Sequence, residues 1–191
     1  MNPAYRQVIH CNGLSMHLVH KNAHSAIVQT FKGLDTEPRS FPWDSPEGYR
    51  FMVIRNPLDK LVSCWSYFCK RPQVREMIEY MAKVGYKLNM TFEAFLEVVL
   101  RRYAENWHTE KQVVFTGGFT MDELCPLEKL NDRWPRLAER FGLGQLPERY
   151  NPSAHNKWDE YYTTETKESV EKVFKEDVEL YKQSINDYRG N

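Results

Sequence analysis

Short apolar runs alternate along this chain with longer stretches whose apolar residues recur at helical spacing. Residues 15–20 and 50–55 are such runs, and each is expected to form a strand. The second run is almost continuously apolar, which is typical of a buried strand in a parallel sheet. Residues 112–115 are expected as a strand or strand-like connection, and 123–128 as a further strand end. This alternation predicts an α/β fold in which helices flank a mostly parallel sheet.

The helical spacing is accompanied by start and stop signals. Pro57 suits the first turn of a helix, Thr91 is an expected N-cap, and Gly142 is an expected C′ residue. Two stretches rich in Pro, Gly and polar residues, 33–48 and 144–160, are expected as loops. Helices are expected over about 25–33, from Pro57, over about 72–84, 92–104 and 129–141, and from about Thr164.

Length and charge narrow the class of protein. The 191 residues are expected to form a single domain, 1–191. Lys+Arg and Asp+Glu both number 26, so the basic excess of a nucleic-acid groove is missing and no nucleic-acid partner is expected. No apolar run reaches the roughly 18–20 residues of a membrane span, and no secretory h-region begins the chain. The four cysteines form no CxxC pair, so reduced thiols and a cytoplasmic location are expected.

A lysine follows the first apolar run, at the turn into the first expected helix. Backbone N–H groups at such a turn, together with the helix dipole, favour an anion such as phosphate. Lys21 adds a positive charge there and Ser25 adds a hydroxyl. In a Walker A loop the lysine instead follows the glycines, and a Ser/Thr holds Mg²⁺, so this order disfavours a metal-dependent kinase. A surface lysine after an edge strand is the open alternative.

A second candidate anion site follows the run 50–55, where Arg55 precedes Asn56-Pro57 and Ser63 comes eight residues later. An arginine at the C-terminal end of a buried strand is costly without an anionic partner. The nucleotide crevice of an open α/β sheet lies at this edge. A structural ion pair, perhaps to Asp59, is the alternative. Two anion sites at strand ends suggest a nucleotide that is phosphorylated at both ends.

Together these elements resemble the sulfotransferase superfamily, which uses 3′-phosphoadenosine 5′-phosphosulfate as donor. In that superfamily an early-lysine loop binds the 5′-phosphosulfate, and an Arg-x-Pro with a later serine holds the 3′-phosphate. The resemblance covers about residues 15 to 181 and implies a P-loop-NTPase-like fold and an enzyme of the EC 2.8.2 type. Segments 108–112, 127–130 and 151–153 look like the carbohydrate-type, sulfotransferase family 2-like branch. The cofactor-binding residues that it implies are Lys21, Asn22, Ala23, His24, Ser25, Ala26, Arg55 and Ser63, with Lys157 from the late loop.

The resemblance also implies a mechanism. Sulfuryl transfer, like phosphoryl transfer, relies mainly on positioning and charge stabilisation. Lys21 is expected to neutralise the oxygen that departs, and a base must take the proton of the acceptor. The catalytic candidates for this base are His108 and Glu37, with His24 and Glu47 also open. No residue in the sequence decides between them.

No metal is expected, because a sulfuryl group carries less charge than a terminal phosphoryl group. His17 and His20 would point to opposite faces of a strand, which does not suit a metal site. The adenine ring is expected to lie on Trp65, Trp107 or Trp158, although core packing suits Trp65 equally well. The acceptor is expected to be a small molecule or carbohydrate hydroxyl. Two alternatives are a P-loop-like small-molecule kinase and a non-catalytic nucleotide-binding module of the same fold.

Overall fold

The computed structural model describes residues 7–32, 34, 39–40, 48–71, 74–147 and 156–189. The chain divides into two compact units. Unit 1 contains Met1–Arg55, Gln112–Pro152 and Glu179–Asn191, and unit 2 contains Asn56–Lys111 and Ser153–Val178. The expectation of a single domain over 1–191 stays a prediction.

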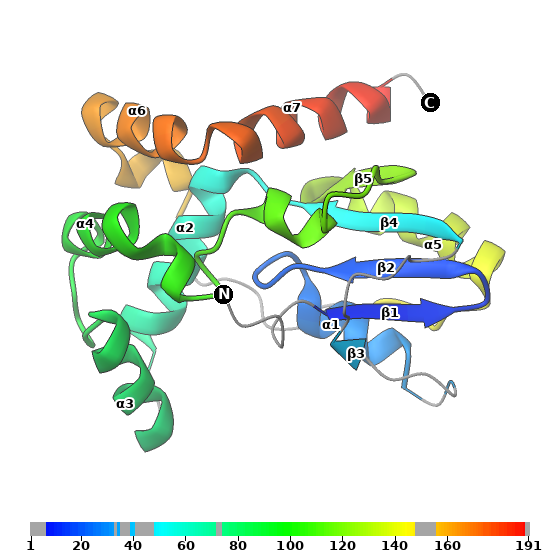
Figure 1. The fold of residues 1–191 in the computed structure, drawn as a ribbon, viewed down its shortest axis with the longest axis horizontal. Coiled ribbons are helices and arrows are strands. Elements are labelled where there is room, and N and C mark those ends of the chain that lie inside the picture. Colours follow the sequence, from blue (N-terminus) through cyan, green and yellow to red (C-terminus); the bar gives the residue numbers. More distant parts are fainter. Residues whose placement is uncertain are drawn as a thin grey trace. The chain divides into compact units, whose positions relative to one another are not determined.

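Unit 1 is built on a five-stranded sheet of order β3-β1-β2-β4-β5 (Figure 1). The pairs β2–β4 and β4–β5 are parallel, whereas β1 is antiparallel to both β2 and β3. The expected strands over 15–20, 50–55 and 123–128 are confirmed as β2, β4 and β5. The bounds are β1 Gln7–Cys11, β2 Leu14–Leu18, β3 Arg39–Ser40, β4 Tyr49–Ile54 and β5 Glu123–Pro126.

Strand β1 is an addition to the predicted strands, and a tight turn joins it to β2. Asn12 and Gly13 have φ angles of 49° and 80°. Two-residue hairpin turns of the primed type need positive φ at both central positions, and Asn-Gly meets that need at low cost. The Cys11↔Leu14 pair closes the ladder at this turn.

Helices α1 (His24–Thr30) and α5 (Leu130–Phe141) pack against one face of the sheet (Figure 1). Phe51 and Val53 of β4 belong to this cluster, while Met52 and Ile54 pack with Phe115 and Leu124 in a second cluster. Because successive side chains of a strand point to opposite faces, β4 is buried on both sides. Gly142, with φ of 64°, ends α5 as predicted.

Unit 2 is helical, with an aromatic core in which Trp65, Phe68, Phe92, Phe95 and Tyr86 are buried. Helices α2 and α4 begin at polar caps: the side chain of Asn56 accepts from the N–H of Leu58, and the predicted cap Thr91 accepts from that of Ala94. The elements are α2 Pro57–Trp65, η2 Ser66–Lys70, α3 Arg75–Val84, α4 Phe92–Arg102, η3 Tyr103–Glu105, η6 Trp158–Tyr161 and α6 Thr164–Val173.

Two segments differ from expectation. Residues 112–115 lie in a 3₁₀ helix, η4 (Gln112–Thr116), rather than in a strand. The expected last helix is divided at Phe174, whose ψ of 28° separates α6 from α7 (Lys175–Arg189). A short 3₁₀ turn, η5 (Leu127–Lys129), joins β5 to α5.

Candidate functional site

The loop after β2 has the backbone geometry of an anion-binding turn. Lys21 and Ala23 have positive φ angles of 70° and 59°, while Asn22 between them does not. Left-handed residues in a turn before a helix can direct backbone N–H groups at an anion, as in a nest. The N–H of Asn22 is already used, because it donates to the carbonyl of Val19 at 3.2 Å. Ala23 is the N-cap of α1 but offers no capping side chain, so the first-turn N–H groups are not capped from this position. Ser25 is exposed at the start of α1.

Arg55 lies directly beside this loop. It follows the last residue of β4, and its guanidinium Nη1 donates to the carbonyl of Lys21 at 2.9 Å. The side chain is largely buried, with 7 % exposed. The loop that contains Lys21 and the arginine of the second candidate element therefore meet at the carboxyl edge of the parallel strands in unit 1.

A buried amide network joins the same two elements. Gln112 Oε1 accepts from the N–H of Arg55 at 3.0 Å, and Gln112 Nε2 donates to the carbonyl of Arg55 at 2.8 Å. Asn22 Nδ2 donates to Gln112 Oε1 at 2.5 Å and to the carbonyl of Val53 at 2.9 Å. The network holds the loop residue Asn22 against the end of β4. The sequence predicts no role for Gln112, and its place in the segment 108–112 is the signal that could have pointed to it.

Two stacked imidazoles flank the loop. His20 and His24 have ring centroids 4.5 Å apart and an interplanar angle of 14°. The Nε2 of His24 lies 3.1 Å from the carboxamide oxygen of Gln7, so it donates to that oxygen. Burial lowers the pKa of His24, because desolvation disfavours the imidazolium. His24 therefore lies beside the loop mainly as a neutral ring at neutral pH. It contributes a hydrogen bond to Gln7 and little positive charge.

The remaining predicted donor residues, Ser63 and Lys157, belong to unit 2. Ser63 is buried in α2, two turns after Pro57, and Lys157 is exposed at the start of η6. Lys21, Asn22 and Arg55 therefore lie together within unit 1. Ser63 and Lys157 lie within unit 2.

The candidate base His108 is held in a defined tautomer in unit 2. Its Nδ1 lies 3.2 Å from Asn106 Oδ1, which also accepts from the His108 backbone N–H at 2.9 Å. A carboxamide oxygen can only accept, so Nδ1 carries the proton and Nε2 keeps its lone pair. That is the form a general base needs. Asn106, which is buried, was not predicted; only its position two residues before His108 pointed to it.

Helix α2 fixes the backbone of the same segment. Lys60 and Cys64 are both buried, one turn apart. Lys60 Nζ donates to the carbonyl of Glu110 at 2.5 Å, and Cys64 Sγ donates to the carbonyl of His108 at 3.2 Å. The position of His108 therefore depends on the helix that follows Arg55 in the chain. Glu37 and Glu47, the loop carboxylates considered as bases, lie outside the described residues.

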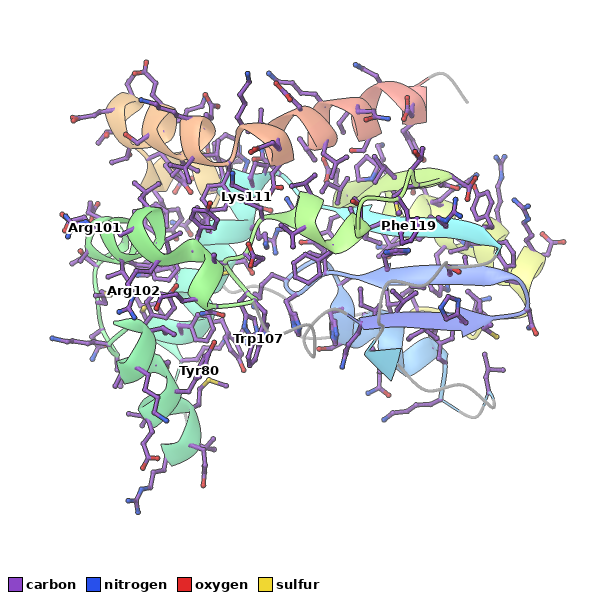
Figure 2. All side chains as sticks on the ribbon, in the orientation of Figure 1. Tyr80, Arg101, Arg102, Trp107, Lys111 and Phe119 are labelled. Atoms are coloured by element: carbon purple, nitrogen blue, oxygen red, sulfur yellow. The ribbon has the colours of Figure 1, made fainter. Side chains whose placement is uncertain are left out.

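The tryptophans expected to bind adenine differ in their surroundings. Trp65 is 8 % exposed and packs on Phe92 and Tyr161, with Nε1 donating to the carbonyl of Met90 at 2.8 Å. It is a core residue. Trp107 is half-buried and stacks on Tyr80 with ring centroids 5.4 Å apart (Figure 2). This stack continues to the ring of His108, 5.5 Å from Trp107.

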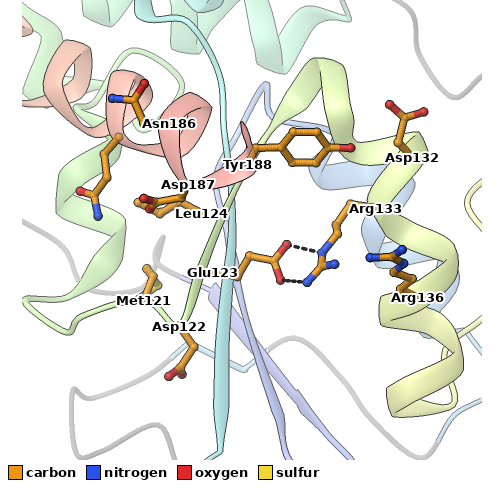
Figure 3. A pocket seen from close by; sticks show the side chains of 11 residues that line it. Met121, Asp122, Glu123, Leu124, Asp132, Arg133, Arg136, Asn186, Asp187 and Tyr188 are labelled. Atoms are coloured by element: carbon orange, nitrogen blue, oxygen red, sulfur yellow. Dashed lines mark hydrogen bonds and ion pairs between the residues drawn. The ribbon is translucent and has the colours of Figure 1, made fainter. Parts of the chain in front are cut away.

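A cavity of about 660 Å³ in unit 1 lies among β5, α5 and α7 and contains none of the predicted site residues. Figure 3 shows its main charged pair, in which Arg133 binds both carboxylate oxygens of Glu123. The carboxylate also accepts from the hydroxyl of Tyr49 at 2.7 Å. These hydrogen bonds raise the pKa of Arg133 above its usual range. The pair joins β4, β5 and α5 and has a structural role.

The four cysteines, all in described ranges, are buried thiols that form no disulfide. Burial raises the pKa of Cys69 and Cys125 to about 12, so both are protonated at neutral pH. Within the described ranges, no group of three or more His, Cys, Asp or Glu side chains is placed to hold a metal ion. No helix in the part of the chain that the structure describes has both the length and the apolar character of a membrane span.

One comparison with known proteins gave a match. The family model described as "Sulfotransferase family" matches residues 11–188, which include Lys21, Arg55 and His108. Comparison with curated proteins and with solved structures gave no match. The family match supports sulfuryl transfer as the general activity of this fold. Because it covers far more than half of the 191 residues, the chain belongs to the sulfotransferase family.

Proposed function

We propose that this protein transfers a sulfuryl group from 3′-phosphoadenosine 5′-phosphosulfate to a hydroxyl of a carbohydrate or small-molecule acceptor. The observation that carries the proposal is the 2.9 Å hydrogen bond from Arg55 Nη1 to the carbonyl of Lys21. It places a guanidinium and a nest-shaped loop at one edge of one sheet. A nucleotide with phosphates at both its 3′ and 5′ positions can use both elements at once.

The donor loop has the role of holding the 5′-phosphosulfate. The N–H groups of the first turn of α1, which have no side-chain cap from Ala23, suit the oxygens of an anionic group, and the hydroxyl of Ser25 adds a further donor. Lys21 supplies a full positive charge next to the bridging oxygen. Arg55 is proposed to bind the 3′-phosphate, since guanidinium groups match phosphate oxygens in pairs. Ser63, eight residues after Arg55 in the sequence, is proposed to assist at the same phosphate, as is Lys157 from the late loop.

In the transfer step, a bond forms between the acceptor oxygen and the sulfur of the sulfuryl group, while the bond from that sulfur to the phosphate oxygen breaks. The electron pair of the broken bond stays on the phosphate oxygen, where the ammonium of Lys21 offsets the charge. His108 Nε2 accepts the proton of the acceptor hydroxyl, because Asn106 holds the other ring nitrogen in its protonated form. The proposed transfer step uses no metal ion.

The acceptor class is proposed from the carbohydrate-type features of the sequence together with the surroundings of His108. The rings of Tyr67, Trp107 and Phe68 surround this histidine, with centroids 5.9, 5.5 and 5.0 Å from it. Aromatic side chains with a few polar groups are the usual lining of small-molecule sites. A hydroxyl on a ring-bearing acceptor is consistent with such a lining.

Donor binding and turnover test the proposal. Calorimetry should show that wild-type protein binds 3′-phosphoadenosine 5′-phosphate without Mg²⁺ and more tightly than it binds ATP. Lys21→Ala should abolish transfer to an acceptor panel while bisphosphate binding remains largely intact, because Lys21 acts on the charge that develops during transfer. Lys32, which is exposed after α1, provides the matched control, and Lys32→Ala should retain full turnover.

Two results would contradict the proposal. Tight, Mg²⁺-dependent binding of ATP with no response to the bisphosphate would indicate a kinase. Bisphosphate binding with no sulfuryl transfer to any acceptor of a broad panel would indicate a non-catalytic nucleotide-binding module.

A further inference from the structure

We infer that Gln112 is a positioning residue of the donor site, an inference that rests on the proposed function. The residue begins η4, and its side chain is fully buried. Its carboxamide joins the end of β4 to the donor loop. The residue itself is not proposed to touch the nucleotide.

The Gln112 carboxamide replaces a neighbouring strand for one residue. The parallel ladder of β4 with β5 ends at Ile54, opposite Pro126. At the next residue, Arg55, the N–H and the carbonyl both pair with the Gln112 side chain, at 3.0 and 2.8 Å. A carboxamide offers the same donor and acceptor as a peptide group, so it continues the ladder without a strand. The backbone of Arg55 is thereby fixed beyond the end of the regular sheet.

The same oxygen of Gln112 holds the donor loop. Asn22 Nδ2 donates to it at 2.5 Å and donates again to the carbonyl of Val53 at 2.9 Å. Asn22 is 1 % exposed, and its Oδ1 is buried without a partner in the described part of the chain. The side chain of Asn22 is therefore held in the interior by the two acceptors that its Nδ2 contacts. One of those acceptors is Gln112.

These contacts set the register between the two phosphate-binding elements. Arg55 reaches the loop through its guanidinium, which donates to the carbonyl of Lys21. Gln112 contacts the loop through the side chain of Asn22, the residue after Lys21. It contacts Arg55 through the backbone N–H and carbonyl of Arg55. A bisphosphate must satisfy both elements simultaneously, so a shift of one relative to the other weakens binding of the whole ligand.

The substitution Gln112→Met keeps the volume of the side chain and removes its hydrogen bonds. We expect the donor KM and the bisphosphate Kd each to rise by roughly 10- to 100-fold, the size expected for loss of one or two buried hydrogen bonds. We expect kcat at saturating donor to stay within about threefold, since the chemistry of Lys21 is retained. A merely structural role would give the opposite pattern, in which less folded enzyme lowers the apparent kcat and KM stays unchanged.

Tyr49→Phe provides the matched control. Tyr49 begins β4, at the opposite end from Arg55, and its hydroxyl donates to Glu123 Oε2 at 2.7 Å. Its substitution removes a hydrogen bond of the same strand, so it should lower stability and leave the donor KM unchanged. If Tyr49→Phe raised KM as much as Gln112→Met, the positioning role would be wrong.

Two further measurements test the positioning role if Gln112→Met does not fold. Gln112→Asn keeps an amide one methylene shorter and should give an intermediate KM. In the wild-type protein, the side-chain NH₂ signals of Gln112 in a ¹H–¹⁵N spectrum should shift on addition of 3′-phosphoadenosine 5′-phosphate; unchanged signals would contradict the inference. If the wild type binds no bisphosphate, the proposed function itself fails. If it binds and Gln112→Met shows wild-type KM and Kd, only the positioning role fails.

Discussion

At the scale of single residues, the candidate site depends on buried polar side chains that act on their neighbours. Gln112 and Asn106 are the two clearest cases, because one holds Arg55 and the other holds His108. No sequence pattern marks an amide side chain that holds another residue in place. An Asn or Gln in a polar segment is usually exposed, so neither residue stands out. Lys21, Arg55 and Ser63 were predicted because each follows or lies near a strand end at a specific spacing. Their supporting amides depend on tertiary contacts, which spacing alone does not give.

The tautomer of His108 leads to a prediction for the pH dependence of turnover. Asn106→Asp places a carboxylate against Nδ1, and this opposite charge favours the imidazolium over the neutral ring of His108. The base must be unprotonated to accept a proton, so the acidic limb of the kcat profile should move to higher pH.

The profile of kcat against pH at saturating substrates measures this shift. Asn106→Ser, which offers a shorter neutral acceptor, is the uncharged control and should lower kcat without the same displacement of the acidic limb. An acidic limb at the same pH in Asn106→Asp and wild type would mean that His108 is not the base.

His17 leads to a prediction for the pH dependence of stability. Burial is the largest cause that lowers its pKa below the ordinary 6.5, the charges of His10 and Arg50 act in the same direction, and a hydrogen bond to the carbonyl of Phe115 opposes them. As pH falls below 6.5, the unfolded chain takes up this proton before the folded chain does. The free energy of unfolding should therefore fall, by up to about 1.4 kcal/mol per pH unit, until the pKa of the folded state is reached.

Denaturant unfolding of wild type and His17→Gln between pH 7.5 and 5.5 tests this effect. The glutamine retains a donor for Phe115 but does not titrate, so the variant should have a flatter dependence. His24, whose pKa is lowered by burial, contributes in the same direction and should leave part of the slope. An equal slope in the two proteins would contradict the assignment to His17.

At the scale of elements, the strands and helices follow largely from the hydrophobic pattern. The continuous apolar run of β4 and the caps Thr91 and Gly142 are examples, because local chemistry decides them. The hairpin of β1 could also have been predicted from the sequence, since Asn12-Gly13 is a strong turn signal between apolar runs. Segment η4 could not have been predicted, because the side chain of Gln112 makes the hydrogen bonds that a strand would make, and hydrophobic spacing does not reveal this.

The cap of α4 gives a test at this scale. The Thr91 hydroxyl accepts from the N–H of Ala94 at 3.3 Å. Thr91→Ala should lower the free energy of unfolding by about 0.5–2 kcal/mol, because an N–H of the first turn loses its partner. Thermal or denaturant unfolding measures the change. Thr91→Ser keeps the hydroxyl and should restore most of the stability; if it were as unstable as the alanine variant, the methyl group rather than the cap would be responsible.

At the scale of the whole molecule, two candidate phosphate-binding residues, Lys21 and Arg55, lie 34 residues apart in sequence and meet at one sheet edge. The family match includes both. The sequence predicted this meeting because the carboxyl ends of neighbouring parallel strands lie at the same edge. It did not identify the acceptor, because acceptor sites are formed by loops whose residues carry no periodic signal.

The central claim is that Arg55 binds the 3′-phosphate of the donor nucleotide. Titration calorimetry tests it most directly, by comparing 3′-phosphoadenosine 5′-phosphate with adenosine 5′-phosphate on wild type, Arg55→Ala and Arg136→Ala. Arg136 is an exposed arginine of α5 and serves as the control. Wild type and Arg136→Ala should bind the bisphosphate more tightly than the monophosphate by about 2–4 kcal/mol, and Arg55→Ala should lose this difference, because the second phosphate has lost its cationic partner. Equal affinities of the wild type for the two nucleotides, or an unchanged difference in Arg55→Ala, would contradict it.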